Sequence, residues 1–247
     1  MSPKSTRFAF VAGATGYTGR EVVRILGEKE CTPIAHIRPD SPRLEYWKKY
    51  FKELGAEIDT TPWEKEALSK SLASWRPDYV FCLIGTTRKR MAQAKKQGKN
   101  PASQSYLAVD YGLTKLLVES IISAGIKPRF IYLSAQGVSP NSASGYFRAR
   151  YLAEQAVIQS GLDYLIVRAS FITGKDRDDK RWLEYLTAQL SDILLFLIKP
   201  LKGGKFYYRY KSFSNTELAE ELVRWGLERS RANLILSPDQ LRLGKKE

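Results

Sequence analysis

The sequence has few residues of the kinds that bind metals or form disulfide frameworks. Its 247 residues include two cysteines and one histidine. A single histidine excludes a metal cluster built on histidines, and His36 lies in an apolar run where a packed side chain is expected. Cys31 and Cys82 show no metal-binding or redox spacing, so we expect reduced, packed thiols in a cytoplasmic protein.

Long apolar runs are also missing. The run "ILLFLI" at 193–198 is far shorter than the roughly 18 to 20 residues that a membrane-spanning helix needs. Next to several lysines it could form a membrane-interface helix, although such a run more often forms the wall or lid of a substrate pocket. The first apolar run ends in a glycine turn, so we expect no signal peptide.

Acidic residues are too few to balance the basic ones, which leaves a net charge of +14. Basic residues are concentrated at 86–100 and 199–211, and the second segment also contains aromatic residues. This composition would suit a nucleic acid or another anionic partner. No recognisable nucleic-acid module appears, so we expect a solvated surface or attraction for a polyanionic dinucleotide instead.

Strand-like and helix-like segments alternate along the first two thirds of the chain. Apolar runs occur at 8–12, 33–37, 80–84, 130–134 and 164–167, with a weaker run at 56–59. Amphipathic segments between them cover 20–30, 44–54, 64–75, 104–124 and 146–159. The alternation predicts βαβ units, and therefore a doubly wound α/β fold whose parallel sheet is covered on both faces.

The last third of the chain breaks this alternation. It reads as a charged loop at 175–181, a helical stretch at 182–198, an extended segment at 203–210 and a helix opened by the capping box Ser214–Glu217. These pieces are too small for an independent domain. We therefore expect one domain over 1–247, with 171–247 as a small substrate lobe over the carboxyl ends of the strands, where such sheets bind ligands.

Three glycines separate the first strand from the first helix in "GATGYTGR", residues 13–20. Without side chains at Gly13, Gly16 and Gly19, the backbone can turn tightly and let a ligand approach the start of the helix. The amides and the positive dipole end of a helix start suit a phosphate. The spacing departs from the G-x-G-x-x-G form, and a glycine turn can also serve only for close packing.

Together with this turn, three further segments resemble one superfamily: "CLIGTTR" at 82–88, "IYLSAQG" at 131–137 and "SGLDYLIVRAS" at 160–170. They resemble the atypical short-chain dehydrogenase/reductases, and more narrowly the NmrA-like and HIV-Tat-interacting-protein-like NAD(P)H-binding proteins. The resemblance implies a Rossmann fold that binds a dinucleotide. Its pyrophosphate would lie against Gly13, Thr15, Gly16, Tyr17 and Gly19, and its ribose beside Gly85, Thr86 and Thr87.

The end of the second strand, "AHIRPDSPR" at 35–43, selects the cofactor. Arginine there can pair with a 2′-phosphate, whereas an acidic residue accepts hydrogen bonds from a ribose diol. Arg38 and Arg43 favour NADP over NAD, although Asp40 leaves a diol contact open and Arg38 could be a solvated surface cation. Asp59, after the third strand, would approach the adenine or serve as a turn residue.

The resemblance also implies a catalytic serine, tyrosine and lysine. Ser134 and Tyr146 stand at the first two positions, but Arg150 stands where the lysine belongs. On one helix face Arg150 could reach the phenol and stabilise a tyrosinate, yet it cannot pass on a proton. Asp110 in place of an asparagine, and "RAS" at 168–170 in place of Arg-Pro-Gly, are further departures. Ser134 could be an ordinary strand-end hydroxyl, and Tyr146 a packed aromatic side chain.

These residues predict an NADP(H)-dependent oxidoreductase that moves hydride to or from a small carbonyl or enone substrate. Tyr146 would be the general acid, Ser134 the oxyanion donor and Arg150 the electrostatic support. One alternative is a catalytically weak, NADP(H)-sensing protein that acts through a protein partner. Another is a nucleotide-sugar epimerase-like enzyme. A homo-oligomer is compatible with each.

Overall fold

The computed structural model describes residues 7–86, 91–92, 96, 100–173 and 204–244. Its main sheet has seven strands in the order β3-β2-β1-β4-β5-β6-β9, and every neighbouring pair is parallel. The strands are β1 (Arg7–Ala12), β2 (Cys31–His36), β3 (Glu57–Asp59), β4 (Tyr79–Cys82), β5 (Arg129–Ala135), β6 (Tyr164–Ala169) and β9 (Leu234–Leu236). A small second sheet pairs β7 (Ile172–Thr173) with β8 (Phe213–Ser214).

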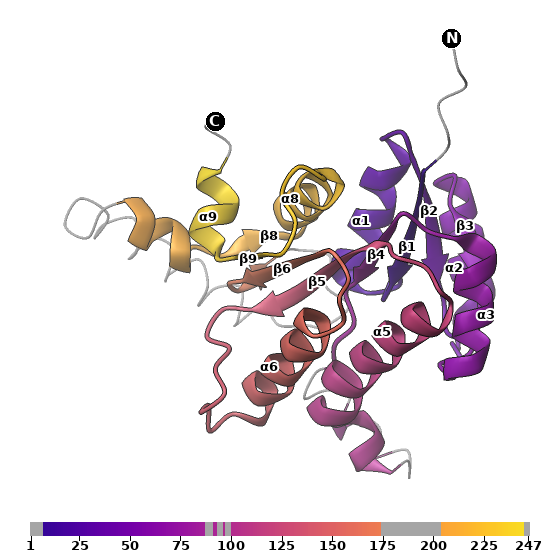
Figure 1. Ribbon diagram of the computed structural model, residues 1–247, viewed down its shortest axis with the longest axis horizontal. Coiled ribbons are helices and arrows are strands. Elements are labelled where there is room, and N and C mark those ends of the chain that lie inside the picture. The colour runs from indigo at the N-terminus through magenta and orange to yellow at the C-terminus, as the bar shows by residue number, and fades with distance from the viewer. Residues whose placement is uncertain (1–6, 87–90, 93–95, 97–99, 174–203, 245–247) are drawn as a thin grey trace.

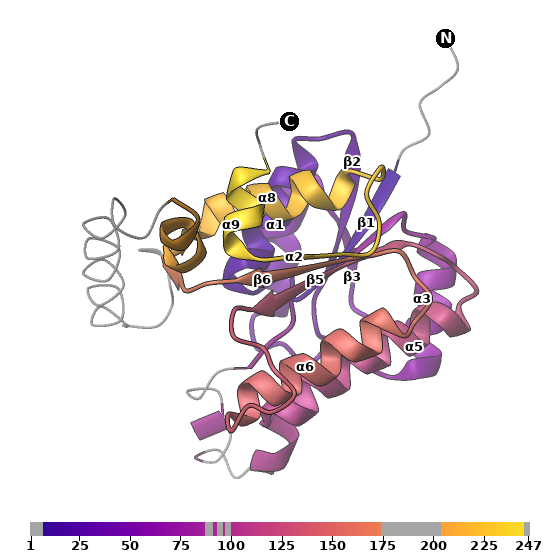
Figure 2. The ribbon, with the colours of Figure 1, turned by 60° about the vertical axis from the view of Figure 1, so that its left-hand side comes forward.

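Helices cover both faces of the main sheet (Figures 1 and 2). One layer contains α1 (Tyr17–Gly27), α2 (Leu44–Glu53), α8 (Asn215–Leu227) and α9 (Pro238–Leu243). The other layer contains α3 (Lys65–Trp75), α5 (Thr114–Ser123) and α6 (Gly145–Ile158). The predicted doubly wound, Rossmann-like fold is confirmed.

The central strands are mostly apolar because both of their faces are buried. All four residues of β4 are buried, and alternate side chains enter opposite layers. Val80 packs in the core beneath α5 and α6, whereas Phe81 packs in the core beneath α1 and α8. Each such side chain contributes roughly 1.5–3 kcal/mol of transfer free energy. The two cores therefore hold the strands in one register.

The order of the strands reverses at β1, which has β2 on one side and β4 on the other. Connections that leave β1 and β4 in opposite directions open a crevice at the carboxyl ends of these strands. The segments that follow β1, β2, β4 and β5 meet along this edge. They carry nearly all of the candidate site residues.

The structure corrects two expectations about the chain and adds two short elements. Residues 204–210 are helical, not extended. The predicted helix at 104–124 is divided into a 3-10 turn η1 (Pro101–Gln104), a π-helix η2 (Leu107–Leu113) and α5. The short strand β9 and helix α9 were not predicted, because three and six residues are too few for a periodic pattern. The segments 175–181 and 182–198 lie outside the described residues.

The expectation for the thiols is confirmed. Cys31 and Cys82 are both free and buried. Burial raises the pKa of each thiol to about 11, so both stay protonated and unreactive near neutral pH. Among the described helices, none is long and apolar enough to cross a membrane.

Candidate dinucleotide site

In the glycine turn after β1, the backbone packs closely against the backbone that follows β4 and against the start of α1. Gly13 has a φ of +88°, and a Cβ there would lie 2.9 Å from the carbonyl oxygen of Leu83, just after β4. A Cβ on Gly19 would lie only 2.1 Å from the carbonyl oxygen of Gly13. The turn therefore packs directly on β4 and on α1, which no other residue type would allow.

The start of α1 is uncapped by any side chain. Gly16 is the N-cap residue, and its own N–H donates to the carbonyl of Gly13 at 2.9 Å. The first turn of α1 contains no acidic residue. Thr15 and Tyr17 flank Gly16, so the five residues predicted to lie against a pyrophosphate form one continuous turn at the helix start.

Arginines gather where β2 ends. Arg38 is exposed, and its Nη1 lies 3.3 Å from Oδ2 of Asp40. The guanidinium of Arg43 lies 4.1 Å from the ring centre of Tyr46 and 4.9 Å from that of Trp47. Arg20, in the first turn of α1, lies 5.6 Å from the same Trp47 ring. A cation of α1 and the N-cap residue of α2 therefore share one indole.

Sequence reasoning missed Arg20. Its position in the sequence is unusual, because a cation in the first turn of a helix is unfavourable next to the positive end of the helix dipole, where acidic residues are preferred. No described carboxylate lies within ion-pair distance of Arg20 or Arg43. These two guanidinium charges are therefore not paired with a carboxylate among the described residues.

Asp59, the last residue of β3, has its carboxylate fully engaged. It accepts hydrogen bonds from the Thr61 backbone N–H at 3.0 Å, the Trp75 Nε1–H at 3.1 Å and the Ser71 hydroxyl. These bonds join the end of β3 to α3. The geometry is that of the turn-residue alternative, with the side chain used to hold two elements together.

The floor of the crevice is formed by the residues after β4. The Thr86 backbone N–H donates to Oδ2 of Asp110 at 3.0 Å, while the Thr86 hydroxyl is buried with no partner among the described residues. A Cβ on Gly85 would lie 2.5 Å from Nη2 of Arg150, so a side chain there would displace that guanidinium. Thr87 lies outside the described residues.

Arg150 is buried and held by oxygen atoms at the ends of β4 and β5. Its Nη2 lies 2.9 Å from Oδ1 of Asp110 and donates to the Ile84 carbonyl at 3.3 Å. Its Nη1 donates to the Leu133 carbonyl and, at 3.3 Å, to the Tyr132 hydroxyl. The guanidinium is thus fixed by the protein itself.

Burial and charge act against each other in this ion pair. Burial raises the pKa of Asp110, and the adjacent guanidinium of Arg150 only partly offsets this. Burial also opposes the charge of Arg150, but the oxygens of Tyr132, Tyr146 and Asp110 outweigh it and raise its pKa. Arg150 is therefore a permanent cation whose charge is balanced by Asp110.

Tyr146 lies above this cation. The guanidinium of Arg150 is 5.4 Å from the centre of its ring, and Tyr106 packs edge-on against the ring at 5.2 Å. The side chain is half-buried. No hydrogen bond joins its hydroxyl to another residue in the described part of the chain. Arg150 thus meets the ring face of Tyr146 and directs its N–H groups elsewhere.

Ser134 belongs to a second buried ionic group. Its hydroxyl donates to Oε1 of Glu154 at 2.5 Å, and Glu154 is fully buried. Arg168, opposite Ser134 in the strand register, binds the same carboxylate through Nε at 3.0 Å and Nη2 at 2.6 Å. The single proton of Ser134 therefore faces Glu154. Sequence reasoning missed Glu154, although it follows Arg150 by one helical turn in α6.

The C-terminal part of the chain reaches the same edge of the sheet. Asn215, the first residue of α8, donates from Nδ2 to the backbone carbonyl of Tyr17 at 3.0 Å. Its Oδ1 is buried and has no partner among the described residues. Ser214 accepts a hydrogen bond from the Glu217 backbone N–H at 3.1 Å, which is one half of the predicted capping box, while the Glu217 carboxylate accepts from Arg242.

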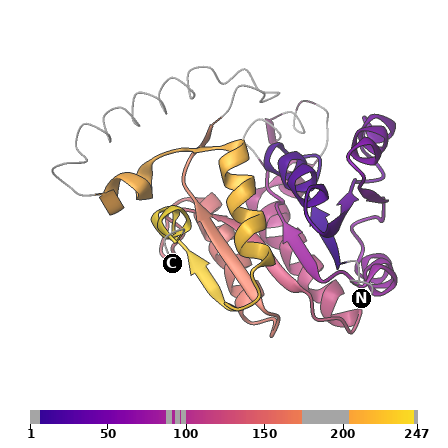
Figure 3. The ribbon, with the colours of Figure 1, turned by 90° about the horizontal axis from the view of Figure 1, so that it is seen from above.

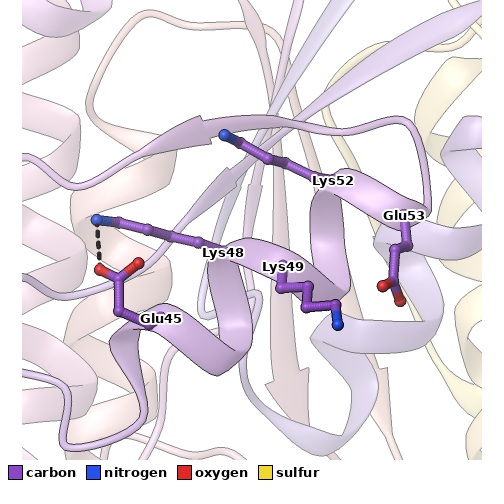
Figure 4. A pocket seen from close by; sticks show the side chains of 5 residues that line it. All are labelled: Glu45, Lys48, Lys49, Lys52 and Glu53. Atoms are coloured by element: carbon purple, nitrogen blue, oxygen red, sulfur yellow. Dashed lines mark hydrogen bonds and ion pairs between the residues drawn. The ribbon is translucent and has the colours of Figure 1, made fainter.

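A hollow of about 470 Å³ lies elsewhere, on the outer side of α2 (Figure 4). Its lining side chains are Glu45, Lys48, Lys49, Lys52 and Glu53, with an ion pair of 2.8 Å between Lys48 and Glu45. All five side chains belong to one helix. We therefore regard the hollow as solvated surface, separate from the crevice.

The sequence profile of a family described as NAD(P)H-binding matches residues 13–189, which is more than half of the chain. This chain belongs to the NAD(P)H-binding family. A curated relative of this NAD(P)H-binding protein is Protein TIC 62, chloroplastic, from Arabidopsis thaliana, which is 27% identical over 244 residues. That alignment covers 90% of this chain but only 34% of the relative.

Two solved structures show the same fold at low sequence identity. The putative NAD-dependent epimerase/dehydratase from Bacillus halodurans has a TM-score of 0.67 at 18% identity, covering 97% of this chain and 99% of that one. The Citrobacter sp. triphenylmethane reductase, complexed with NADP(H), has a TM-score of 0.58 at 15% identity, covering 94% and 69%.

The residues in the crevice fit a nicotinamide dinucleotide. Gly13, Gly16 and Gly19 leave three positions of the turn at the start of α1 without side chains, as close approach of a pyrophosphate requires. Two buried polar atoms have no partner in the described chain: Thr86 Oγ1, after β4, and Asn215 Oδ1, at the start of α8. Such atoms are costly to bury unless a ligand or water supplies the missing bond.

Proposed function

We propose that this NAD(P)H-binding protein uses NADP(H) in preference to NAD(H). The observation that supports this choice is the group of three cations, Arg20, Arg38 and Arg43, beside the glycine turn and the end of β2. Arg20 and Arg43 have no ion-pair partner among the described residues, so a 2′-phosphate could pair with them and compete with exposed Asp40 for Arg38. The acid available for a diol, Asp40, is exposed and already paired with Arg38.

Calorimetric titration with NADPH and NADH tests the preference. We expect the Arg38→Ala/Arg43→Ala variant to bind NADPH about ten- to a hundred-fold more weakly, since charged hydrogen bonds contribute roughly 1.5–3 kcal/mol. Binding of NADH should change far less. The Lys49→Ala/Lys52→Ala variant removes the same charge from the hollow on α2 and should bind both cofactors normally. Equal losses for NADPH and NADH would contradict the proposal.

For the chemistry, we propose an oxidoreductase acting on a small carbonyl or enone substrate. A reduced nicotinamide supplies hydride when bound. Tyr146 would donate a proton from its hydroxyl to the substrate oxygen, and the fixed charge of Arg150 beneath its ring would stabilise the resulting phenolate. Ser134 could donate to the substrate oxygen only by releasing Glu154. Residues 171–247 would contribute the substrate lobe.

NADPH consumption across a panel of carbonyl compounds tests this assignment. We expect Tyr146→Phe to reduce kcat by about 10²-fold or more, the usual contribution of a general acid. Tyr151→Phe, on the next turn of α6, is the matched control and should retain activity. Equal turnover by the wild type and Tyr146→Phe would remove Tyr146 from the mechanism.

The second candidate is an NADP(H)-sensing protein that acts through a protein partner. One observation favours it: Nη1 and Nη2 of Arg150 are bound to Asp110, to two carbonyl oxygens and to the Tyr132 hydroxyl, which leaves only its buried Nε–H without a partner among the described residues. Wild-type protein that distinguishes NADPH from NADP⁺ in affinity, yet turns over no substrate in the panel, would support this candidate. Robust turnover would exclude it.

A further inference from the structure

Residues 198 positions apart meet at the start of α1. Asn215 opens α8, Tyr17 opens α1, and the side-chain amide of one donates to the backbone carbonyl of the other. Helix α8 packs along α1, as the view in Figure 3 shows. The C-terminal part of the chain therefore touches the turn on which a pyrophosphate would lie.

The orientation of the Asn215 amide follows from its neighbour. Nδ2 must face the Tyr17 carbonyl, because the opposite orientation would place two acceptor oxygens against each other. Oδ1 then points away from Tyr17. It is buried, and no described residue donates to it. A buried carbonyl oxygen of this kind needs a donor from outside the described chain.

The position of α8 indicates which part of a dinucleotide could supply that donor. The arginine group lies toward β2, so the adenosine half and its 2′-phosphate belong on that side of the turn. Helix α8 packs over β5 and β6, on the other side of α1. The pyrophosphate itself offers only acceptors, whereas the ribose hydroxyls and the carboxamide NH₂ of the nicotinamide half are donors.

We propose that Asn215 is a cofactor-binding residue that accepts a hydrogen bond from the nicotinamide half of the dinucleotide. The inference rests on the proposed binding of NADP(H). It assigns the C-terminal part of the chain a direct contact with the reactive half of the cofactor. Asn215 would then make two hydrogen bonds: its Nδ2 donates to the Tyr17 carbonyl, and its Oδ1 would accept from the cofactor.

Two probes separate the halves of the cofactor: NADPH and 2′,5′-ADP, which contains the 2′-phosphate and no nicotinamide. We expect Asn215→Ala to bind NADPH at least five-fold more weakly in calorimetry. Its affinity for 2′,5′-ADP should stay within about two-fold of wild type, since a single hydrogen bond is lost and only on the nicotinamide side. Thr216→Ala, at the exposed next position, is the control and should bind both probes normally.

Each other outcome has a defined meaning. If Asn215→Ala binds both probes equally more weakly than the wild type, Asn215 only shapes the turn through Tyr17. If its affinity for both probes is unchanged, no bond to the cofactor forms. Either result overturns the inference. Wild type that binds 2′,5′-ADP and NADPH equally well would also overturn it, while leaving the arginine site intact. Wild type that binds neither probe would instead refute the proposed function.

A second measurement avoids the variant altogether, in case Asn215→Ala does not fold. In the NMR spectrum of the wild-type protein, the side-chain amide resonances of Asn215 should shift on addition of NADPH. They should shift much less with 2′,5′-ADP at the same saturation. Equal shifts with the two probes would overturn the inference.

Discussion

At the scale of single residues, the pair of Arg150 and Asp110 determines the electrostatics of the crevice floor. A guanidinium stays charged at any accessible pH, so it cannot escape burial by losing its proton. Asp110 is fully buried beside it, and burial raises the pKa of that carboxyl. Each member of such a pair is tolerated only because the other is present.

We therefore expect the two members to be strongly coupled in stability. Asp110→Asn or Arg150→Met alone should lower the free energy of unfolding by about 3 kcal/mol, because each leaves a buried group without its partner. The double variant should lose clearly less than the combined loss of the two single variants. Urea denaturation of the wild type and the three variants measures this coupling. Additive losses would show that the pair does not act as a unit.

His36 gives a separate, pH-dependent prediction. Burial lowers its pKa, although the Thr61 carbonyl, which accepts from Nε2 at 2.8 Å, and Asp59 act in the opposite direction. The native ring is therefore neutral at a pH where the unfolded chain, with a pKa near 6.5, binds a proton. Stability should fall as the pH drops below about 6.5, and more steeply than in His36→Gln.

Because His36 is the only histidine, its ring resonances can be assigned without ambiguity. An NMR titration measures the pKa of His36 in the native protein, and urea denaturation between pH 5 and pH 7.5 measures the free energy of unfolding. A native pKa at or above 6.5 would contradict the prediction.

At the scale of elements, the glycine turn depends on contact between α1 and the backbone before it. Replacing Gly19 with alanine would place a Cβ 2.1 Å from the Gly13 carbonyl oxygen and 2.8 Å from that of Ala14, and backbone cannot move aside as a side chain can. We expect Gly19→Ala to cost roughly 1–3 kcal/mol of stability, as overpacking does. It should also weaken NADPH binding, because α1 would move away from the turn.

Gly145→Ala is the matched control, since a Cβ at that helix start meets no atom within 4 Å. It should be neutral or slightly stabilising. Thermal denaturation and NADPH titration of the two variants compare them. A Gly19→Ala protein with wild-type stability and affinity would show that α1 can shift without consequence for the site.

Sequence patterns predicted the elements whose apolar residues recur, and missed the contacts between distant side chains. Strands β1, β4 and β5 were predicted because they are buried and mostly apolar, whereas the run that predicted β3 was weaker because that strand is short and largely polar. The helix at 204–210 was mistaken for a strand because its tyrosines favour extended structure, whereas the contacts that close its C-terminal end come from Arg242. No local pattern links Ser134 to Glu154 and Arg168, since strand register and helix packing bring them together.

At the scale of the whole molecule, the C-terminal residues complete the structure around the crevice. Strand β9 pairs with β6 at the edge of the main sheet, and α8 packs on α1. Arg242 of α9 joins these parts: it donates to the carbonyls of Tyr208 at 2.8 Å, Lys211 at 3.0 Å and Ser212 at 2.7 Å. It also binds Glu217 in the first turn of α8, at 2.9 Å. One side chain therefore connects α9, the helix at 204–210 and the start of α8.

Removing this side chain should loosen the region that carries Asn215 without unfolding the sheet. We expect Arg242→Ala to speed amide hydrogen exchange over residues 204–217, because three carbonyls and a carboxylate lose their donor. Exchange in β1, β4 and β5 should change little. Arg229→Ala, which removes an exposed arginine, should leave both regions as in the wild type. If exchange rises equally across the central strands, the C-terminal residues unfold together with the sheet, and Arg242 stabilises the whole fold.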